Sequence, residues 1–211
     1  DDLIKIRRDF HEHPELGMQE IRTSKIVNEL LTKWGIKAYT GIGKTGVVGV
    51  LEGNKPGKTI GLRADMDALP IQEKTNLPYS SKTPGVMHAC GHDSHTTMLL
   101  GAARYLSEKK DFSGKAIFIF QPAEEGLGGA KAMLEDKLFE KFPCDEIYGL
   151  HNWPTGELGK VSIKPGVAMA GADFFDIKIR AFGSHAARPE GSKDPIIIAS
   201  TLISQLQSIV S

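Results

Sequence analysis

Over residues 1–165, stretches that predict strands alternate with stretches that predict helices, and this alternation restricts the fold more than any other feature of the sequence. The segment KAIFIFQ, residues 115–121, is a continuous apolar run, as expected for a strand covered on both faces. The other predicted elements are strands at 47–53, 59–64 and 146–151, and helices at 2–11, 20–34, 128–139 and after a cap at Asp93 or Ser94. The alternation favours an α/β fold with a mostly parallel central sheet flanked by helices.

The sequence changes character near residue 165. Alternating polar and apolar residues predict a strand over 171–183, a polar loop follows, and residues 196–210 predict an amphipathic helix. One strand and one helix cannot bury their own apolar faces. We therefore expect residues 1–165 to belong to a larger α/β domain and residues 166–211 to be the start of a smaller, incomplete one.

Composition and charge exclude several classes of partner. The sequence is 40% hydrophobic and 25% charged, as in ordinary soluble globular proteins. Its 26 basic residues balance 26 acidic ones, and no basic run is interleaved with aromatic residues, so it predicts neither nucleic-acid binding nor membrane binding. The N-terminus does not resemble a signal peptide, no apolar run reaches membrane-spanning length, and two cysteines fit a reducing compartment. A cytoplasmic protein is the expectation, with a removed leader left open because Asp1 is not an initiator methionine.

Residues 41–46, GIGKTG, have the glycine spacing of a nucleotide-binding loop. Such loops bind phosphate where a strand ends and a helix begins, because the helix N–H groups face the phosphate. The segment that follows, VVGVLEG, is rich in β-branched residues and predicts a strand instead. We therefore expect a tight turn between two strands at 41–46 and no nucleotide site.

Side chains that commonly bind metal ions gather in residues 85–95, GVMHACGHDSH. They are His88, Cys90, His92 and His95, from a chain with only seven histidines and two cysteines. Polar residues also stand where three predicted strands end, namely Asp65 and Asp67, Glu124 and Glu125, and His151. Ligand sites of open α/β sheets form outside the carboxyl ends of the strands, so these segments can converge. Carboxylates, imidazoles and a thiolate form the ligand set of a divalent metal ion.

Each of these residues also has an ordinary structural interpretation. Adjacent glutamates can simply favour the positive end of a helix, a lone cysteine is more often a small buried apolar residue, and aspartates before Pro70 can form a turn. His151 can be a core histidine, and His11 and His13, which precede Pro14, are interpreted as structural. Those interpretations must all hold independently, whereas one metal site explains four segments together. The metal site is therefore the preferred interpretation.

Six ordered motifs carry a resemblance to a known family. In chain order they are RRDFHEHPELGMQE, GLRADMDALP, MHACGHDSHTTMLLGAA, FIFQPAEEGLGGAKAML, GLHNWP and GSHAARP. With them the chain resembles, over essentially its whole length, the M20 metallopeptidase-like amidohydrolases. The resemblance is to the branch that contains hippurate hydrolase, N-acyl-amino-acid deacylases and the auxin-conjugate hydrolases.

The resemblance implies a catalytic α/β domain that holds two divalent metal ions, interrupted by a smaller α/β lid domain that forms a homodimer. Residues 1–165 are then the N-terminal part of the catalytic domain, and residues 166–211 are the start of the lid. By position, the metal ligands are Cys90, His92, Glu125 and His151. Glu124 matches the general base, Asp65 the acid that orients a metal-binding group, and His185 a lid histidine that reaches a substrate in the partner subunit. His88 and His95 receive no ligand role and are interpreted as structural or as neighbours of the ligands.

The implied activity is metal-dependent hydrolysis of the amide bond of N-acyl-L-amino acids, with zinc or manganese as the expected metal and cobalt or nickel as alternatives. An aminopeptidase or dipeptidase of the same family, a metal-binding module without activity and a scaffold protein are the rival interpretations. The family has a further histidine ligand near its C-terminus, beyond Ser211. We therefore expect this chain to be a fragment, or the ordered part of a longer protein, with little activity alone.

Overall fold

The computed structural model describes residues 2–171 and 173–210, and the chain divides into two compact units. The first unit is Asp1–Gly156 and the second is Glu157–Ser211. The boundary between them lies somewhat before residue 165, where the sequence changes character. Among the residues described, no helix is long and apolar enough to cross a membrane.

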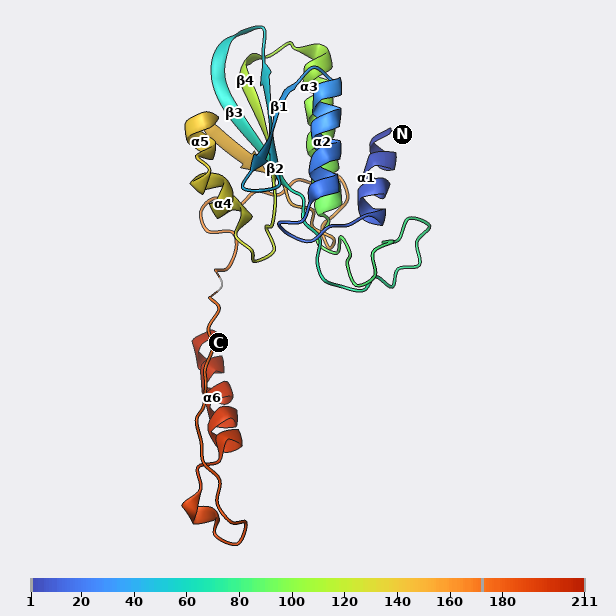
Figure 1. Cartoon of the computed structure of the whole chain (residues 1–211). Coiled ribbons are helices and arrows are strands. Elements are labelled where there is room, and N and C mark those ends of the chain that lie inside the picture. Colours follow the sequence, from blue (N-terminus) through green and yellow to red (C-terminus); the bar gives the residue numbers. More distant parts are fainter. Residues whose placement is uncertain (1, 172, 211) are drawn as a thin grey trace. The chain divides into compact units, whose positions relative to one another are not determined.

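A five-stranded sheet in the order β1-β2-β4-β3-β5 is the centre of the first unit (Figure 1). β1 pairs antiparallel with β2, and β2 antiparallel with β4, whereas β3 pairs parallel with both β4 and β5. Every strand except β2 therefore runs in the same direction, which confirms the predicted mostly parallel sheet. The strands are β1 (Lys37–Ile42), β2 (Gly46–Glu52), β3 (Lys55–Asp65), β4 (Ser113–Gln121) and β5 (Glu146–Gly149).

Helices cover both faces of this sheet, as Figure 1 shows. α1, α2 and α3 contribute to a core on one face, and α4 and α5 to a core on the other. This arrangement confirms the α/β class that the alternation of elements predicts. The helices are α1 (Asp2–Glu12), α2 (Ile21–Lys33), α3 (His92–Lys109), α4 (Gly129–Glu135) and α5 (Leu138–Lys141).

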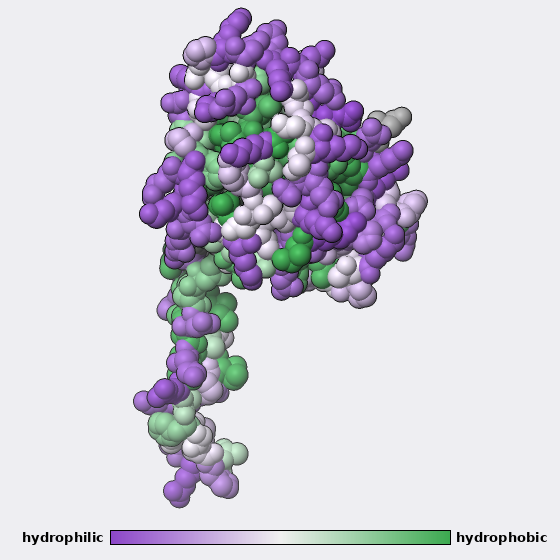
Figure 2. All heavy atoms as spheres, turned by 45° about the horizontal axis from the view of Figure 1, so that its top comes forward, coloured by the Kyte–Doolittle hydropathy of each residue, from purple (hydrophilic) through white to green (hydrophobic). Residues whose placement is uncertain are grey.

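The second unit contains a short 3-10 helix, η1 (Pro189–Gly191), and a longer helix, α6 (Pro195–Val210). The strand predicted over 171–183 is wrong for the residues described there, because only Phe182 pairs, in a single bridge with Lys193. A strand needs a neighbour for its backbone N–H and C=O groups, and the described part of this unit supplies no more than that bridge. Figure 2 shows green, hydrophobic residues along the unit, and Phe174 is 93% exposed.

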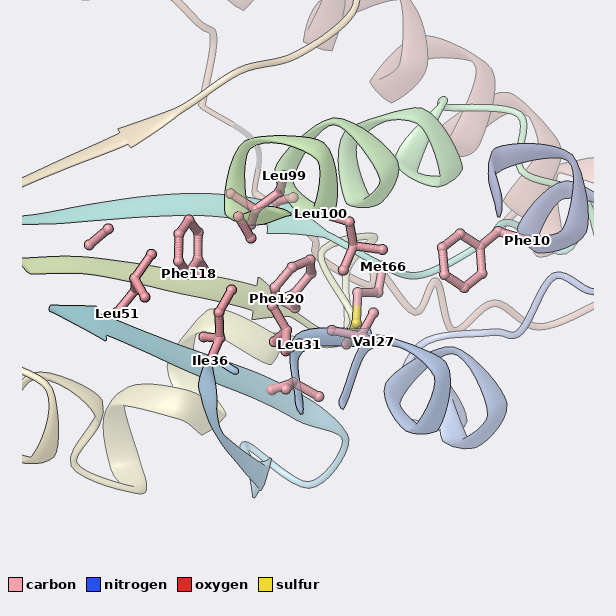
Figure 3. Packing of buried hydrophobic residues seen from close by; sticks show 14 residues of the cluster. Phe10, Val27, Leu31, Ile36, Leu51, Met66, Leu99, Leu100, Phe118 and Phe120 are labelled. Carbon is pink, nitrogen blue, oxygen red and sulfur yellow. The ribbon is translucent and has the colours of Figure 1, made fainter. Parts of the chain in front are cut away.

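The main core of the first unit lies between the sheet and helices α1, α2 and α3 (Figure 3). Phe10 of α1, Leu31 of α2 and Leu100 of α3 belong to the same buried cluster as Phe118 and Phe120 of β4. Burial of an apolar side chain of this size contributes about 1.5–3 kcal/mol. The cluster therefore fixes the position of β4 relative to α3.

The sequence of β4 reflects its place between two layers of helices. Phe118 and Phe120 join the core beside α2 and α3, whereas Ile117 and Ile119 join a second cluster with residues of α4 and α5. Successive side chains of a strand point to opposite faces, so a doubly covered strand needs apolar residues at every position. The predicted coverage of this segment on both faces is confirmed.

The turn predicted over 41–46 joins β1 to β2, which confirms a tight connection between two strands. Gly43 and Lys44 both have positive φ angles, of 64° and 81°. A Cβ atom at Gly43 would lie only 2.7 Å from Cγ of Met133. Glycine is therefore needed at this position for its backbone conformation and for close packing against α4.

α3 begins at His92 with Gly91 in the N-cap position, so the predicted cap at Asp93 or Ser94 is wrong. Gly91 has a φ of 92°, and a Cβ atom there would lie 2.5 Å from Oδ1 of Asn152. A glycine can take this left-handed conformation without steric cost. It brings the backbone of the helix start close to the segment that follows β5.

Asp93, one of the two predicted cap residues, belongs instead to a buried polar cluster. The Asp93 carboxylate accepts a hydrogen bond from Nδ1 of His11 (2.8 Å) and pairs with Nε of Arg7 (2.8 Å). Nε2 of His11 lies 3.2 Å from Oε1 of Glu73. The hydrogen bond with Asp93 raises the pKa of His11, and together with the charge of Asp93 it outweighs the lowering effect of burial. His11 therefore links α1, α3 and the loop between β3 and α3.

The helix predicted over 128–139 is two helices, α4 and α5, so its continuity is wrong. Lys137 breaks it with a left-handed φ of 63°. Leu138 and Phe142, which follow the break, are buried in the second core cluster. The break thus lets α5 place its apolar residues on the sheet, and no glycine or proline marks it in the sequence.

Candidate metal centre

The predicted ligands of the first unit gather at one end of the sheet. Asp65 is the last residue of β3, Glu124 and Glu125 follow β4, and His151 follows β5. The segment Cys90–His92 joins them at the start of α3. Because β3, β4 and β5 are parallel neighbours, their carboxyl ends lie at the same edge of the sheet. The strand order thus unites segments that are far apart in the sequence.

His92 is the centre of the cluster, and its side chain is completely buried. Its Nδ1 lies 3.2 Å from Oδ1 of Asp67, which fixes the ring and makes Nδ1 the donor. Its Nε2 has no hydrogen-bond partner among the described residues. That atom faces three carboxylates, at 3.6 Å from Asp65, 3.7 Å from Glu125 and 3.9 Å from Glu124. A buried nitrogen lone pair surrounded by carboxylates fits a site for a cation.

Three overlapping groups of side chains have the spacing of a metal site. In each group, one ligand atom from every residue lies within 4.8 Å of the others. The groups are Cys90, His92 and His151; Asp65, His92 and His95; and His92, Glu124 and Glu125. Within the first of them, Sγ of Cys90 lies 3.5 Å from Nε2 of His151. The shared residue of all three groups is His92, so one imidazole connects the whole cluster.

The electrostatics around Cys90 also favour a bound cation. Burial raises the pKa of its thiol to about 12, and the hydrogen bond and charge of Glu125 and the charges of Asp65 and Glu124 act in the same direction. Without a cation the thiol therefore stays protonated. A divalent metal ion reverses this balance, because a coordinating thiol loses its proton. The donor set of thiol, imidazole and carboxylate is the one that such an ion prefers.

Asp65 and His95 form a buried pair beside this cluster. Oδ1 of Asp65 lies 2.6 Å from Nδ1 of His95, and the backbone N–H of Asn152 donates to Nε2 of the same ring (2.9 Å). Burial raises the pKa of Asp65, but the hydrogen bond with His95 and the charges of His92 and Arg63 lower it to about 2. Asp65 is therefore a carboxylate at neutral pH, and His95 connects it to the segment after β5.

Asp67 has a role that the sequence alone did not identify, although its place just after β3 was expected. One of its oxygens holds His92, and the other accepts a hydrogen bond from the backbone N–H of Glu125 (3.0 Å). Burial raises the pKa of Asp67, but the hydrogen bonds from His92 and from the N–H groups of Glu125 and Glu124 lower it. Asp67 therefore orients both an imidazole and the backbone of the adjacent glutamates.

The two glutamates differ in exposure. The Glu124 side chain is 43% exposed and that of Glu125 is 27% exposed. Ala123, which precedes them, is buried and has a φ of 47°, in the left-handed region that residues with a side chain rarely adopt. The two consecutive carboxylates that follow this turn therefore differ in their exposure to solvent.

Two further histidines lie outside the cluster's contacts. His88 is buried, and burial lowers its pKa to about 4, so it is neutral at physiological pH. His185 belongs to the second unit, where it is exposed and its Nδ1 accepts a hydrogen bond from the backbone N–H of Ala187 (3.1 Å). All predicted site residues except His185 therefore meet within the first unit.

Comparison with known proteins shows the family of the chain. Residues 61–210 match the sequence profile described as peptidase family M20/M25/M40. Hippurate hydrolase of Campylobacter jejuni is 57% identical over 207 residues, which are 98% of this chain and 54% of that protein. The chain thus spans about half the length of this relative.

Solved structures also resemble the chain, and two of them illustrate the similarity. One, from methicillin resistant Staphylococcus aureus and described as a candidate aminohydrolase, has a TM-score of 0.82 and 38% identity, over 99% of this chain and 56% of that one. The other, the YXEP protein of Bacillus subtilis, is described as a dinuclear metal binding peptidase from family M20. It has a TM-score of 0.69 and 46% identity, over 73% of this chain and 43% of that one. Since the family profile covers well over half of its residues, the chain belongs to peptidase family M20/M25/M40.

Proposed function

We propose that this site hydrolyses the amide bond of N-acyl-L-amino acids and holds two divalent metal ions, zinc or manganese, for this purpose. The observation that carries the proposal is the buried Nε2 of His92, which has no hydrogen-bond partner among the described residues and faces Asp65 and Glu125. An imidazole nitrogen with a free lone pair can bind a divalent metal ion, and the nearby thiol and carboxylates are donors that such an ion also binds. The similarity to a hippurate hydrolase supports the substrate class, because hippurate is an N-acyl amino acid.

The residues that would hold the ions are Cys90, His92, Glu125 and His151. Divalent ions bound there would lower the pKa of water towards neutrality and would polarise the amide carbonyl. Asp67 keeps His92 in the tautomer that leaves Nε2 free, through its hydrogen bond to Nδ1. Asp65 lies 3.6 Å from this free Nε2, on the side where an ion would bind, and its carboxylate is itself held by His95. It would orient the metal-binding group from there.

Glu124 is the proposed general base. It is the more exposed of the two glutamates and lies next to the cluster, 3.9 Å from Nε2 of His92. Its carboxylate takes a proton from the water molecule that attacks the carbonyl carbon, and it returns that proton to the leaving nitrogen as the C–N bond breaks. The products are a carboxylic acid and an amino acid. Glu125 cannot share this role if its carboxylate is engaged as a ligand.

The second unit would contribute to binding rather than to the metal centre. In the proposed whole enzyme, which is cytoplasmic, residues 166–211 begin a lid domain that forms a homodimer. His185 of this unit would donate a hydrogen bond to the oxyanion of a substrate in the partner subunit. Its Nδ1 accepts a hydrogen bond from Ala187, so the N–H at Nε2 of this exposed ring would be the donor.

Peptide hydrolysis is the second candidate function, since the YXEP protein, at 46% identity, is described as a peptidase. The test is a substrate panel with the full-length gene product, which compares N-benzoylglycine and N-acetyl amino acids with dipeptides that carry a free amino group. We expect hydrolysis of the N-acyl compounds that is lost on chelation and restored by zinc or manganese. Faster turnover of dipeptides would favour the peptidase, and a metal-loaded protein without turnover of either class would refute both.

A further inference from the structure

The turn that places the two glutamates is held by a residue from the start of the chain. Oε1 of Glu20 accepts a hydrogen bond from the backbone N–H of Ala123 (2.8 Å), across 103 residues of sequence. Oε2 of the same carboxylate accepts a hydrogen bond from the hydroxyl of Thr45 (2.6 Å). Ala123 is the residue with the left-handed φ of 47°, directly before Glu124. Glu20 therefore contacts the backbone at the point where the chain turns towards the site.

Glu20 is an unusual residue to find at this place. Its side chain is completely buried, and among the residues described no lysine, arginine or histidine forms an ion pair with it. Burial of a carboxylate without a cation costs free energy, so the presence of an acidic residue at such a position calls for an explanation. Its contacts supply one, because among the described residues its carboxylate has two hydrogen-bond partners, the hydroxyl of Thr45 and the N–H of Ala123.

The segment that carries Glu20 is itself fixed on both sides. The Glu15 carboxylate accepts hydrogen bonds from the backbone N–H groups of Arg22 (2.9 Å) and Thr23 (2.8 Å), which anchors the first turn of α2. The carbonyl of Glu15 accepts a hydrogen bond from the N–H of Ala68 (2.8 Å), next to Asp67. These hydrogen bonds hold the backbone on both sides of Glu20 in place, so its side chain starts from a fixed position.

Two carboxylates thus hold the segment Ala123–Glu125 from opposite ends. Glu20 accepts the N–H of Ala123, and Asp67 accepts the N–H of Glu125. A Cβ atom at Gly17 would lie 3.0 Å from that of Ala123, so the neighbouring loop also packs closely against the turn. The residue between the two anchored N–H groups is Glu124.

We propose that Glu20 is a positioning residue, which keeps the left-handed turn at Ala123 in place and so fixes the direction of Glu124 and Glu125. The inference rests on the proposed function, in which Glu124 is the base and Glu125 a metal ligand. In the described part of the chain, the Glu20 carboxylate makes its hydrogen bonds with Thr45 and Ala123 and not with a predicted ligand side chain. It acts through one backbone hydrogen bond.

The test compares three substitutions in the full-length gene product. Glu20→Met keeps the length of the side chain and removes both acceptors, whereas Glu20→Gln keeps an oxygen for Ala123 and offers an N–H to the Thr45 hydroxyl. Thr45→Val is the matched control, because it removes the other contact of Glu20 and leaves the Ala123 contact intact. In metal-loaded protein with N-benzoylglycine, we expect Glu20→Met to lower kcat by on the order of 10²-fold, the cost of a displaced catalytic group, with KM nearly unchanged. Glu20→Gln and Thr45→Val should stay close to the wild type.

Hydrogen exchange of the Ala123 amide gives a second measurement that does not depend on activity. We expect it to exchange faster in Glu20→Met than in the wild type and in Thr45→Val, while amides in the middle of β4 stay protected. Unchanged exchange and kcat in folded Glu20→Met, or equal losses in Thr45→Val, would overturn the proposal. If Glu20→Met does not fold, Glu20→Asp, which keeps the charge but falls short of Ala123, replaces it with the same expectations. If the wild type hydrolyses no N-acyl amino acid, the proposed function fails, and the exchange of the Ala123 amide still decides whether Glu20 holds the turn.

Discussion

Each unit of the chain contains a segment whose sequence predicts a strand, and the two segments have different outcomes. In the first unit, the apolar run 115–121 forms β4 and is buried between two layers of helices. In the second, the alternating segment 171–183 forms no strand where it is described, and Phe174 is exposed to solvent. β4 has β2 and β3 as hydrogen-bonded neighbours, whereas the described residues of the second unit offer no more than the bridge at Phe182. A local pattern thus determines structure only where distant parts of the chain complete the backbone pairing.

The largest expected effect tests the claim that the chemistry belongs to the first unit. In the full-length gene product, Glu124→Gln should lower kcat by about 10²–10⁴-fold, the usual contribution of a general acid–base group. The metal content should stay unchanged, because the amide replaces the base and not a ligand. Measurements of kcat and elemental analysis of the same preparation check both points. Glu125→Gln is the matched control and should lose metal instead, so the opposite pattern would exchange the two roles.

The packing difference between the units can be measured directly with two phenylalanines. Phe118→Ala, in the buried centre of β4, should reduce the free energy of unfolding by about 3–5 kcal/mol through lost burial and the cavity left behind. Phe174→Ala, at a residue 93% exposed, should change it by no more than about 0.5 kcal/mol. Urea denaturation of the chain followed by circular dichroism gives both values. A similar loss in the two variants would show that the second unit packs its apolar residues as firmly as the first.

Much of the first unit could be predicted from its sequence because its signals are local. The run 115–121 identified a doubly covered strand, and the glycines of 41–46 identified a turn. The start of α3 was predicted wrongly, because Asp93 has the chemistry of a helix cap but its carboxylate pairs with His11 from another helix. The break at Lys137 carries no glycine or proline, and it depends on where α5 meets the sheet.

The site, too, could be predicted from the sequence only in part. The rule that ligands gather at the carboxyl ends of parallel strands brought Cys90, His92 and Glu125 to one place. It gave no role to Asp67 or Glu20, because their contacts are set by the register of neighbouring strands and by a loop that crosses to β4. The spacing of Asp65 and Asp67 was a usable signal, since residues two apart in an extended segment point to the same side.

The next expected effect concerns the contact that orders the metal centre. Asp67→Asn should lower the affinity for zinc or manganese by about 10–100-fold, as is typical when a residue that orients a ligating imidazole is lost. Asparagine has one oxygen and no negative charge, so it cannot accept the hydrogen bonds from His92 and from the N–H of Glu125 at the same time, as Asp67 does. Titration with metal under competition from a chelator measures the affinity. Asp145→Asn is a suitable control, because that aspartate accepts the backbone N–H of Thr59 (2.7 Å) at an exposed position beside β5. An equal loss of affinity in both variants would contradict the role given to Asp67.

The smallest expected effect lies in the buried cluster behind α3, and it depends on pH. Because the contacts with Asp93 and Glu73 raise the pKa of His11 above its ordinary 6.5, the folded state binds a proton more tightly there than the unfolded state. The resulting stabilisation is fully present below pH 6.5 and is lost as the pH rises through the raised pKa of the folded state. Glu73 and Asp93 have lowered pKa values and stay charged throughout this window. His11→Gln keeps polar contacts but cannot be protonated, so the difference in unfolding free energy between wild type and variant, measured by urea denaturation without metal, should shrink from pH 6 to pH 9. A difference that stays constant or grows over this window would show that His11 is neutral in the folded chain.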